Sequence, residues 1–228
     1  MQPQKKRALV LLSGGLDSSV CLAIAVGAFG EENVRALSLS YGQKHEREVG
    51  AAKDVSTYYG VPHEVVTLDP GIFRGQGSTL TDPDAPLPKM TYEELQESFG
   101  VSPTYVPFRN GNLLSVAAAL ALRHQVGYIY AGMHAEDARN WAYPDCTPEF
   151  LGAMANAIYV GTYHKVRLVT PLAWMTKADV VRKGASMKLP FALTWSCYAG
   201  GPAPCGTCPT CISRAAAFAE AGVEDGGR

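Results

Sequence analysis

The chain has 228 residues, of which 47% are hydrophobic and 18% charged, and its net charge is −1, which fits one folded α/β domain rather than a disordered chain. Without a basic excess we expect no direct contact with a nucleic acid. No apolar run is long enough for a membrane helix, and the run near the N-terminus is too short for a signal peptide, so we expect a cytoplasmic protein with no membrane contact.

Strand and helix patterns alternate along the chain. The predicted strands are Ala8–Leu12, Val34–Leu39, His63–Val66 and Tyr128–Ala131. The predicted helices are Ser18–Phe29, Glu46–Tyr59, Asn112–His124, Glu149–Tyr159 and Lys177–Met187. This alternation is typical of parallel βαβ units. It predicts an α/β fold with a doubly wound parallel sheet, a single domain over residues 1–222, and ligands beyond the carboxyl ends of the strands.

Two stretches depart from this pattern. Pro70–Pro107 is rich in Gly, Pro, Asp and Thr, with one short helical segment at Thr91–Ser98. A loop of this length is usually functional or disordered, so it is either a cover or partner contact, or a solvated excursion without a role. The last residues, Val223–Arg228, are predicted to be disordered.

The segment SGGLDS at residues 13–18 joins the first predicted strand to the first helix. Gly14 and Gly15 lack Cβ atoms, so their backbone can approach an anion and take positive φ. Unpaired N–H groups at a helix start bind phosphate, and Asp17 suits a Mg²⁺ ion that accompanies it. The segment resembles the SGGxDS pyrophosphate loop of the ATP pyrophosphatase superfamily; an ordinary glycine-rich turn is the alternative. The loop residues predicted to bind ATP are Leu12, Ser13, Gly14, Gly15, Leu16, Asp17 and Ser18.

Further polar residues are placed near this loop by the predicted topology. Ser38 and Tyr41 lie at the end of the second strand, where they could contact the adenosine of ATP or simply form a turn. Lys165 and Lys177 could reach a pyrophosphate, although single lysines are usually surface residues. Together with Asp17 and Ser18, these two lysines are the predicted catalytic residues.

Acidic and basic groups also flank the later elements. Arg109 and Asn110 precede a long helix, and the Arg109 guanidinium could bind a carboxylate or phosphate. Glu136 and Asp137 follow a strand, where they could hold Mg²⁺, accept hydrogen bonds from a purine-like ring, or begin a solvated helix.

Cys146 lies among polar residues in a predicted loop. A nucleophilic role would need a base such as His134 or His164 nearby, which the sequence cannot place. We therefore favour a packing or substrate-lining role.

Four cysteines near the C-terminus form a C-x7-C-x2-C-x2-C pattern, Cys197, Cys205, Cys208 and Cys211. The segment 195–214 is rich in Gly and Pro, so metal binding would supply the free energy that orders it. Four thiolates would fill a tetrahedral Zn²⁺ site and make the ion structural. An iron–sulfur cluster and, in an oxidising compartment, two disulfides are the alternatives.

Several ordered segments together resemble one family. They are the loop, the cysteines, Tyr41–His45, Val106–Asn110, Glu136–Asp137, Tyr143–Cys146, Pro148–Phe150 and Leu193–Tyr198. From Ala8 to Phe218 the chain resembles the 7-cyano-7-deazaguanine synthase (QueC) family.

The resemblance implies an ATP-dependent C–N ligase of queuosine biosynthesis. It would convert 7-carboxy-7-deazaguanine and ammonia to 7-cyano-7-deazaguanine (preQ0), through an adenylated acid and an adenylated amide, and release AMP and diphosphate. It also implies one structural Zn²⁺ per chain, Mg²⁺ with ATP, and a homodimer. The residues implied for the deazaguanine site are Arg109, Asn110, Glu136, Asp137, Tyr143 and Asp145.

Three other functions are compatible with the loop. RNA-modifying adenylases and thiolases share it, but they usually carry a basic surface or an added RNA-binding domain. A relative could make the same nitrile for antibiotic or DNA-modification chemistry. A zinc-stabilised nucleotide-binding module without turnover is the third, and the intact Asp17 and Ser18 argue against it.

Overall fold

The computed structural model describes residues 6–43 and 47–226. Its strands are β1 (Ala8–Leu11), β2 (Val34–Ser40), β3 (His63–Thr67), β4 (Tyr128–Tyr130) and β5 (Arg167–Val169). Its helices are α1 (Leu16–Phe29), α2 (Arg47–Tyr58), α3 (Tyr92–Phe99), α4 (Arg109–Arg123), α5 (Pro148–Gly161), α6 (Lys177–Ser186) and α7 (Pro209–Ala221). Short 3₁₀ turns lie between them.

The five strands form one parallel sheet in the order β3-β2-β1-β4-β5. Ala8 in β1 is paired with Val34 in β2 on one side and with Tyr128 in β4 on the other. The chain therefore builds outward from β1 to β3 and then returns to β4. Because the direction reverses between β1 and β4, a crevice for ligands is expected at the carboxyl ends of these two strands.

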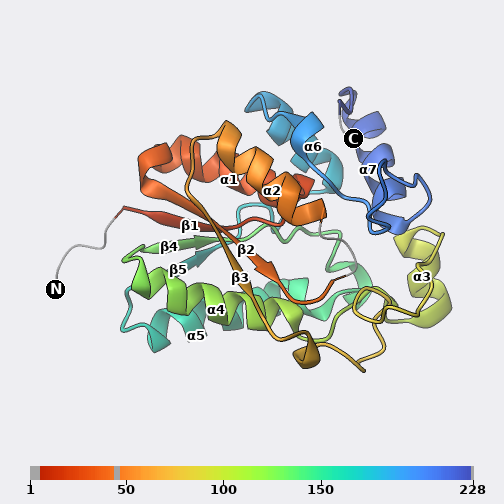
Figure 1. Cartoon of the computed structure of the whole chain (residues 1–228), viewed down its shortest axis with the longest axis horizontal. Coiled ribbons are helices and arrows are strands. Elements are labelled where there is room, and N and C mark those ends of the chain that lie inside the picture. The colour runs from red at the N-terminus through yellow and green to blue at the C-terminus, as the bar shows by residue number, and fades with distance from the viewer. Residues whose placement is uncertain (1–5, 44–46, 227–228) are drawn as a thin grey trace.

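Helices cover both faces of the sheet, with α1, α2 and α6 on one face and α4 and α5 on the other (Figure 1). Alternate strand residues point to opposite faces, so Val10 packs under α1 and α6 whereas Leu9 packs against α4 and α5. The helices α3 and α7 lie beyond the carboxyl ends of the strands (Figure 1). The predicted doubly wound parallel fold is confirmed.

Most predicted elements are present, with shifted ends. The helix α1 begins at Leu16 rather than Ser18, and α4 begins at Arg109 rather than Asn112. Glu46, the predicted start of α2, lies outside the described residues. The strand β5 was missed because three residues give no readable alternation, and α7 was missed because it starts inside the cysteine segment, with Pro209 at its first position.

The stretch between β3 and α4 has a small core of its own. Phe73, Leu80 and Val106 are buried together with Tyr41, which follows β2. The helix α3 starts with a capping box, in which the Thr91 side chain accepts from the Glu94 N–H and the Glu94 carboxylate accepts from the Thr91 N–H. A wholly solvated excursion is therefore wrong for this part of the chain.

The end of the chain is also held. The side chain of Arg214 is buried in α7 and donates to both carboxylate oxygens of Asp225, at 2.6 and 2.8 Å. Val223 packs against the core beside α7. The expectation of disorder from residue 223 is thus wrong for these two residues, because a buried guanidinium needs an anion; residues 227–228 lie outside the described part of the chain. No helix in residues 6–43 and 47–226 is long and apolar enough to cross a membrane.

We expect Gly14→Ala to destabilise the fold strongly. Gly14 has φ of +87°, and a Cβ there would lie 2.3 Å from the Glu48 carbonyl oxygen and 2.5 Å from the Ala52 nitrogen, both backbone atoms of α2. Strain and overpacking together should lower the free energy of unfolding by about 2–5 kcal/mol in urea titrations. In the control Gly152→Ala, in α5, a Cβ meets nothing within 4 Å, so we expect about 0.5–1 kcal/mol of stabilisation. Equal stability of the two variants would contradict the packing argument.

Candidate functional site

A cavity of about 590 Å³ lies at the carboxyl ends of the strands. Five helices begin at its wall, and their first residues, Leu16, Tyr92, Arg109, Lys177 and Pro209, all line it. The N–H groups of a helix's first turn have no partner within the helix and carry partial positive charge. The parallel sheet therefore directs several partial positive charges into one cavity, which suits a polyanion.

The loop after β1 is held in shape by its own serines. The Ser13 N–H donates to Ser18 Oγ at 3.1 Å, the two hydroxyls lie 3.0 Å apart, and the Gly15 N–H lies 3.3 Å from Ser13 Oγ. Both serines and Gly15 line the cavity. Gly14 does not, because it turns away from the cavity and packs against α2. Gly14 thus has a role in close packing, and its contact with ATP stays a prediction.

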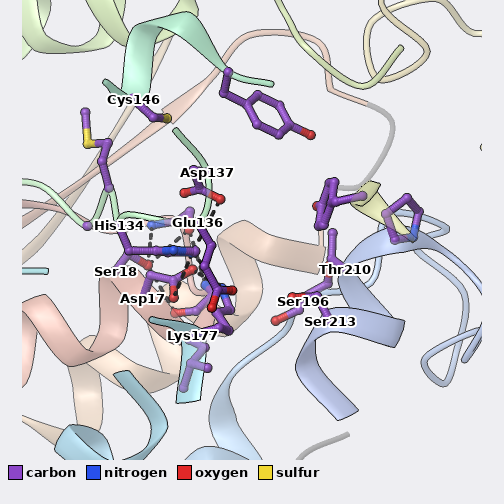
Figure 2. Close-up of a pocket in the computed structure, with 18 of the residues that line it drawn as sticks. Asp17, Ser18, His134, Glu136, Asp137, Cys146, Lys177, Ser196, Thr210 and Ser213 are labelled. Carbon is purple, nitrogen blue, oxygen red and sulfur yellow. Dashed lines mark hydrogen bonds and ion pairs between the residues drawn. The ribbon is translucent and has the colours of Figure 1, made fainter. Parts of the chain in front are cut away.

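A cluster of charged residues faces this loop across the start of α1. Lys177 Nζ lies 2.6 Å from Asp17 Oδ2, and His134 Nε2 lies 3.3 Å from Asp137 Oδ1, 3.4 Å from Lys177 Nζ and 3.9 Å from Asp17 Oδ1. Figure 2 shows these residues together with Glu136 around one point of the cavity. The sequence placed them on three separate segments, and the strand order brings them together.

Electrostatics keep Asp17 ionised in this cluster. Burial raises the pKa of its carboxyl, but Lys177 and His134 outweigh burial and bring the pKa below its ordinary value. Two buried polar atoms in the cluster, Asp17 Oδ1 and His134 Nδ1, have no hydrogen-bond partner among the described residues. Buried polar atoms are normally paired, so both atoms suit a bound cation or substrate.

His134 was not predicted as part of this site, only as a base that Cys146 would need. Its side chain is 4% exposed. The signal for it was its position four residues after β4, at the same end of the sheet as the phosphate loop. The close approach is possible because Gly132 has no side chain: a Cβ there would lie 3.0 Å from the backbone of Asp17.

The other arm of the cavity is aromatic. Arg109 Nη1 donates to the Tyr41 hydroxyl at 3.2 Å, and the Arg109 Nε is buried without a partner among the described residues. Tyr92, Tyr143 and Tyr198 line the same arm. Flat rings and one cation that still has a free donor can hold a planar heterocycle that carries a carboxylate.

Asp145 does not line the cavity, contrary to the predicted substrate role. It is 2% exposed, and its Oδ2 accepts from the backbone N–H of Asn110 at 2.9 Å. The Asn110 side chain donates back to the Asp145 carbonyl and to Cys146 Sγ. This reciprocal pair fixes the start of α4 and hence Arg109. This carboxylate therefore caps the first turn of α4 and, since it is buried away from the cavity, does not face a ligand there.

Cys146 does line the cavity, but its environment opposes a thiolate. Burial and the carboxylates of Asp137 and Asp145 raise the pKa of the thiol well above its ordinary value. His134 points its Nε2 at carboxylates and at Lys177, and no hydrogen bond joins it to Cys146 among the described residues. This environment favours the lining role that was also favoured from the sequence.

Lys165 lies at the wrong end of the sheet. It precedes β5, so it sits at the amino ends of the strands, whereas the cavity lies at their carboxyl ends. Lys177, at the start of α6, is the lysine that reaches the site. The predicted site residues that line the cavity are Leu12, Ser13, Gly15, Leu16, Asp17, Ser18, Ser38, Tyr41, Arg109, Asn110, Glu136, Asp137, Tyr143 and Lys177.

The four cysteines meet in space. Their sulfur atoms all lie within 4.8 Å of one another, although the two ends of the pattern are 14 positions apart in the sequence. Tetrahedral zinc with Zn–S bonds near 2.3 Å requires sulfur atoms about 3.8 Å apart, so only small shifts are needed. Burial raises the pKa of the Cys205 thiol, but N–H groups of Thr207 and Cys208 outweigh it and bring the pKa to about 6. Burial raises the pKa of the Cys197 and Cys211 thiols, so these electrostatics favour a thiolate at Cys205 but not at these two. The close approach of the four sulfur atoms is what suits the cluster to a metal ion.

This cysteine segment also contributes cavity residues that the sequence did not indicate. Ser196, Thr210 and Ser213 line the cavity opposite the Asp17 cluster (Figure 2). Trp195 connects the segment to the phosphate loop, since its backbone N–H donates to the Gly14 carbonyl at 2.9 Å. The cysteine segment is therefore one wall of the site.

We expect the hydrogen bond of Asp145 to matter more than its charge. Asp145→Ala leaves the buried Asn110 N–H without an acceptor and should cost about 1–3 kcal/mol of unfolding free energy, whereas Asp145→Asn keeps an acceptor and should cost less. Burial raises the pKa of Asp145 in the folded state, so the protonated form is favoured by folding. Wild type should therefore gain stability relative to Asp145→Asn as the pH falls from 7 towards 4. Urea titrations at several pH values test this, and a loss on acidification would contradict it.

The fold and site define a class: an α/β nucleotide-binding protein with a serine- and glycine-containing phosphate loop at the switch point of a parallel sheet. A solved structure shares the fold. The U34-tRNA thiolase NcsA from Methanococcus maripaludis aligns with a TM-score of 0.51 at 15% identity, over 94% of this chain and 64% of that one. At this identity the likeness shows the fold alone.

The particular family follows from sequence comparison. The family model of the queuosine biosynthesis protein QueC matches residues 7–222. The chain is 42% identical over 226 residues to the 7-cyano-7-deazaguanine synthase of Thermoplasma acidophilum, covering 97% of this chain and 91% of the relative. It is 40% identical to the enzyme of that name from Caldicellulosiruptor bescii, covering 96% and 95%. The chain belongs to the QueC family.

Proposed function

We propose that this protein is a 7-cyano-7-deazaguanine synthase, which converts 7-carboxy-7-deazaguanine and ammonia to the 7-nitrile at the expense of ATP. The observation that carries the proposal is one cavity with two unlike arms. The phosphate loop and Lys177 line one arm, and Arg109 with the tyrosines lines the other. Such a cavity brings the phosphates of ATP next to a planar acid, which is what adenylation of that acid requires.

In the first step, a carboxylate oxygen of the acid attacks the α-phosphorus of ATP. An O–P bond forms, the bond between the α-phosphorus and the bridging oxygen breaks, and pyrophosphate leaves. Ser13, Ser18 and the first turn of α1 would hold the pyrophosphate, and Lys177 would offset its charge. Arg109 would orient the acid's carboxylate, which neutralises its charge and brings it near the phosphorus.

Ammonia then attacks the carbonyl carbon of the acyl-adenylate. A C–N bond forms, the C–O bond to AMP breaks, and a proton leaves the nitrogen to give the amide. The amide oxygen attacks a second ATP, and loss of AMP and two N–H protons leaves the nitrile. The balance is one acid, one ammonia and two ATP in, with one nitrile, two AMP and two pyrophosphate out. Both oxygens thus leave on phosphorus, because neither is a good leaving group by itself.

Two metal ions fit residues of this chain. Mg²⁺ bound with ATP would be held by Asp17, whose buried Oδ1 accepts no hydrogen bond from the described residues, and would supply charge neutralisation at the phosphates. Zn²⁺ would be held by the four cysteine sulfurs. With all four positions filled by sulfur it would supply structure rather than water activation.

The setting of the reaction follows the same proposal. Free thiolates for a metal need a reducing compartment, which supports a cytoplasmic enzyme. Its substrates are small molecules, and the balanced charge of the chain supports a reaction without direct nucleic-acid contact. We propose a homodimer as the oligomeric state, to be checked by light scattering.

A mass-spectrometric assay tests the function directly. Purified protein is incubated with ATP, Mg²⁺, ammonium and 7-carboxy-7-deazaguanine. We expect the nitrile, with two AMP and two pyrophosphate for each nitrile formed. AMP without nitrile would point to a different acid, and no AMP from folded, metal-loaded protein would overturn the proposal.

Lysine substitutions separate the two predicted catalytic lysines. Lys177→Met removes the charge that faces the leaving pyrophosphate, and we expect kcat to fall by about 100-fold or more. Lys165→Met is the matched control, because Lys165 lies at the amino ends of the strands, away from the cavity. The kcat of this variant should stay within about twofold of wild type. A Lys165→Met enzyme that lost as much activity as Lys177→Met would contradict this site.

Removal of one metal ligand should unfold the cysteine segment. We expect Cys205→Ser to lose bound zinc by elemental analysis and to melt at a lower temperature, because zinc binding is coupled to folding of the segment. The control Cys21→Ala removes a buried cysteine of α1 that is not in the cluster and should keep one zinc per chain. A metal-free Cys205→Ser variant with wild-type melting would contradict the structural role.

A further inference from the structure

The start of the cysteine segment carries a tyrosine whose hydroxyl has no role in the proposed mechanism. Tyr198 follows Cys197 directly and lines the cavity. It packs against two separate clusters, one of which contains Trp195, Cys197 and Cys208, and the other Phe73 and the stretch between β3 and α4. Tyr198 is therefore the side chain that joins these two parts of the molecule over the cavity.

A single hydrogen bond extends this junction to α3. The hydroxyls of Tyr198 and Tyr92 lie 3.0 Å apart, although the residues are 106 positions apart in the sequence. Tyr92 is the first residue of α3, and five of the eight side chains of this helix are exposed. A short helix with little buried surface has low local stability. The bond to Tyr198 is one of the contacts that hold α3 in place, together with the buried side chain of Leu95 and the ion pair of Glu93 with Arg139.

The position of α3 matters because it forms one wall of the aromatic arm. The rings of Tyr92 and Tyr143 meet edge to face, with centroids 6.0 Å apart and planes at 75°. Tyr92 and Gln96, one turn later, both line the cavity. A displacement of α3 would widen this arm without touching the phosphate loop.

The same segment also fixes the opposite arm. Trp195 lies three residues before Tyr198, and its backbone N–H donates to the Gly14 carbonyl in the phosphate loop. One short piece of chain thus holds the ATP side at Trp195 and the wall of the acid side at Tyr198. Adenylation requires the carboxylate and the α-phosphorus at contact distance. The distance between the Trp195 and Tyr198 contacts therefore affects the reaction.

We propose that Tyr198 is a positioning residue: through its hydroxyl bond to Tyr92 it fixes α3 as the wall of the acid-binding arm, at a set spacing from the phosphate loop. This inference rests on the proposed function for its kinetic part. Its structural part, the ordering of α3 by Tyr198, is independent of turnover.

The test uses Tyr198→Phe, Tyr92→Phe and the double variant of the full chain. Each single variant removes the same bond from a different side, so the result does not depend on one variant folding well. We expect the KM for the acid to rise about two- to tenfold, which is the worth of one hydrogen bond, and the KM for ATP to stay within about twofold. The double variant should be no worse than either single one. Tyr163→Phe, with a side chain that is 86% exposed, is the matched control.

Hydrogen exchange gives a readout apart from activity. Amides of residues 92–99 should exchange faster in both single variants than in wild type or Tyr163→Phe. Unchanged exchange there, additive effects in the double variant, or an equal rise in both KM values would each overturn the inference. If wild type makes no nitrile, the proposed function fails, and the exchange of residues 92–99 still decides whether Tyr198 orders α3.

Discussion

The contacts of Gly14 hold the site together. The residue has positive φ, its Cα lies against the backbone of α2, and its carbonyl accepts the Trp195 N–H. The phosphate loop is therefore fixed from two sides by backbone atoms, which leave no room for a side chain. Because the loop cannot shift, the Ser13 and Ser18 hydroxyls and the start of α1 are arranged for a phosphate before any ligand arrives.

Charge in the cavity is balanced between the fold and the side chains. The starts of helices that line the cavity contribute partial positive charge from the backbone, while Asp17, Glu136 and Asp137 add carboxylates beside the ammonium of Lys177. The backbone thus favours a polyanion, and the carboxylates favour a cation that accompanies it. A nucleotide bound with Mg²⁺ meets both requirements.

The proposed chemistry needs two substrates in contact, and each is held by a different part of the chain. The loop proposed to bind the phosphates is carried by β1 of the sheet, whereas the aromatic arm is closed by α3 and by the cysteine segment, which lie beyond the strands (Figure 1). Neither of these two parts has a large core of its own. A metal bound to the four sulfurs would stabilise the second and, through Tyr198, the first.

Local patterns in the sequence determined the parallel sheet, the phosphate loop and the metal cluster, because alternation, a glycine turn and cysteine spacing are short-range signals. They also singled out Arg109 and Lys177 as candidate site residues, and both line the cavity. Strand order decided the rest. It separated Lys177 from Lys165. These lysines are twelve positions apart, and because β5 runs between them they lie at opposite ends of the strands. It brought His134 to Asp17 and turned Asp145 to the backbone of Asn110, because side-chain partners across the sheet depend on packing that no local pattern records.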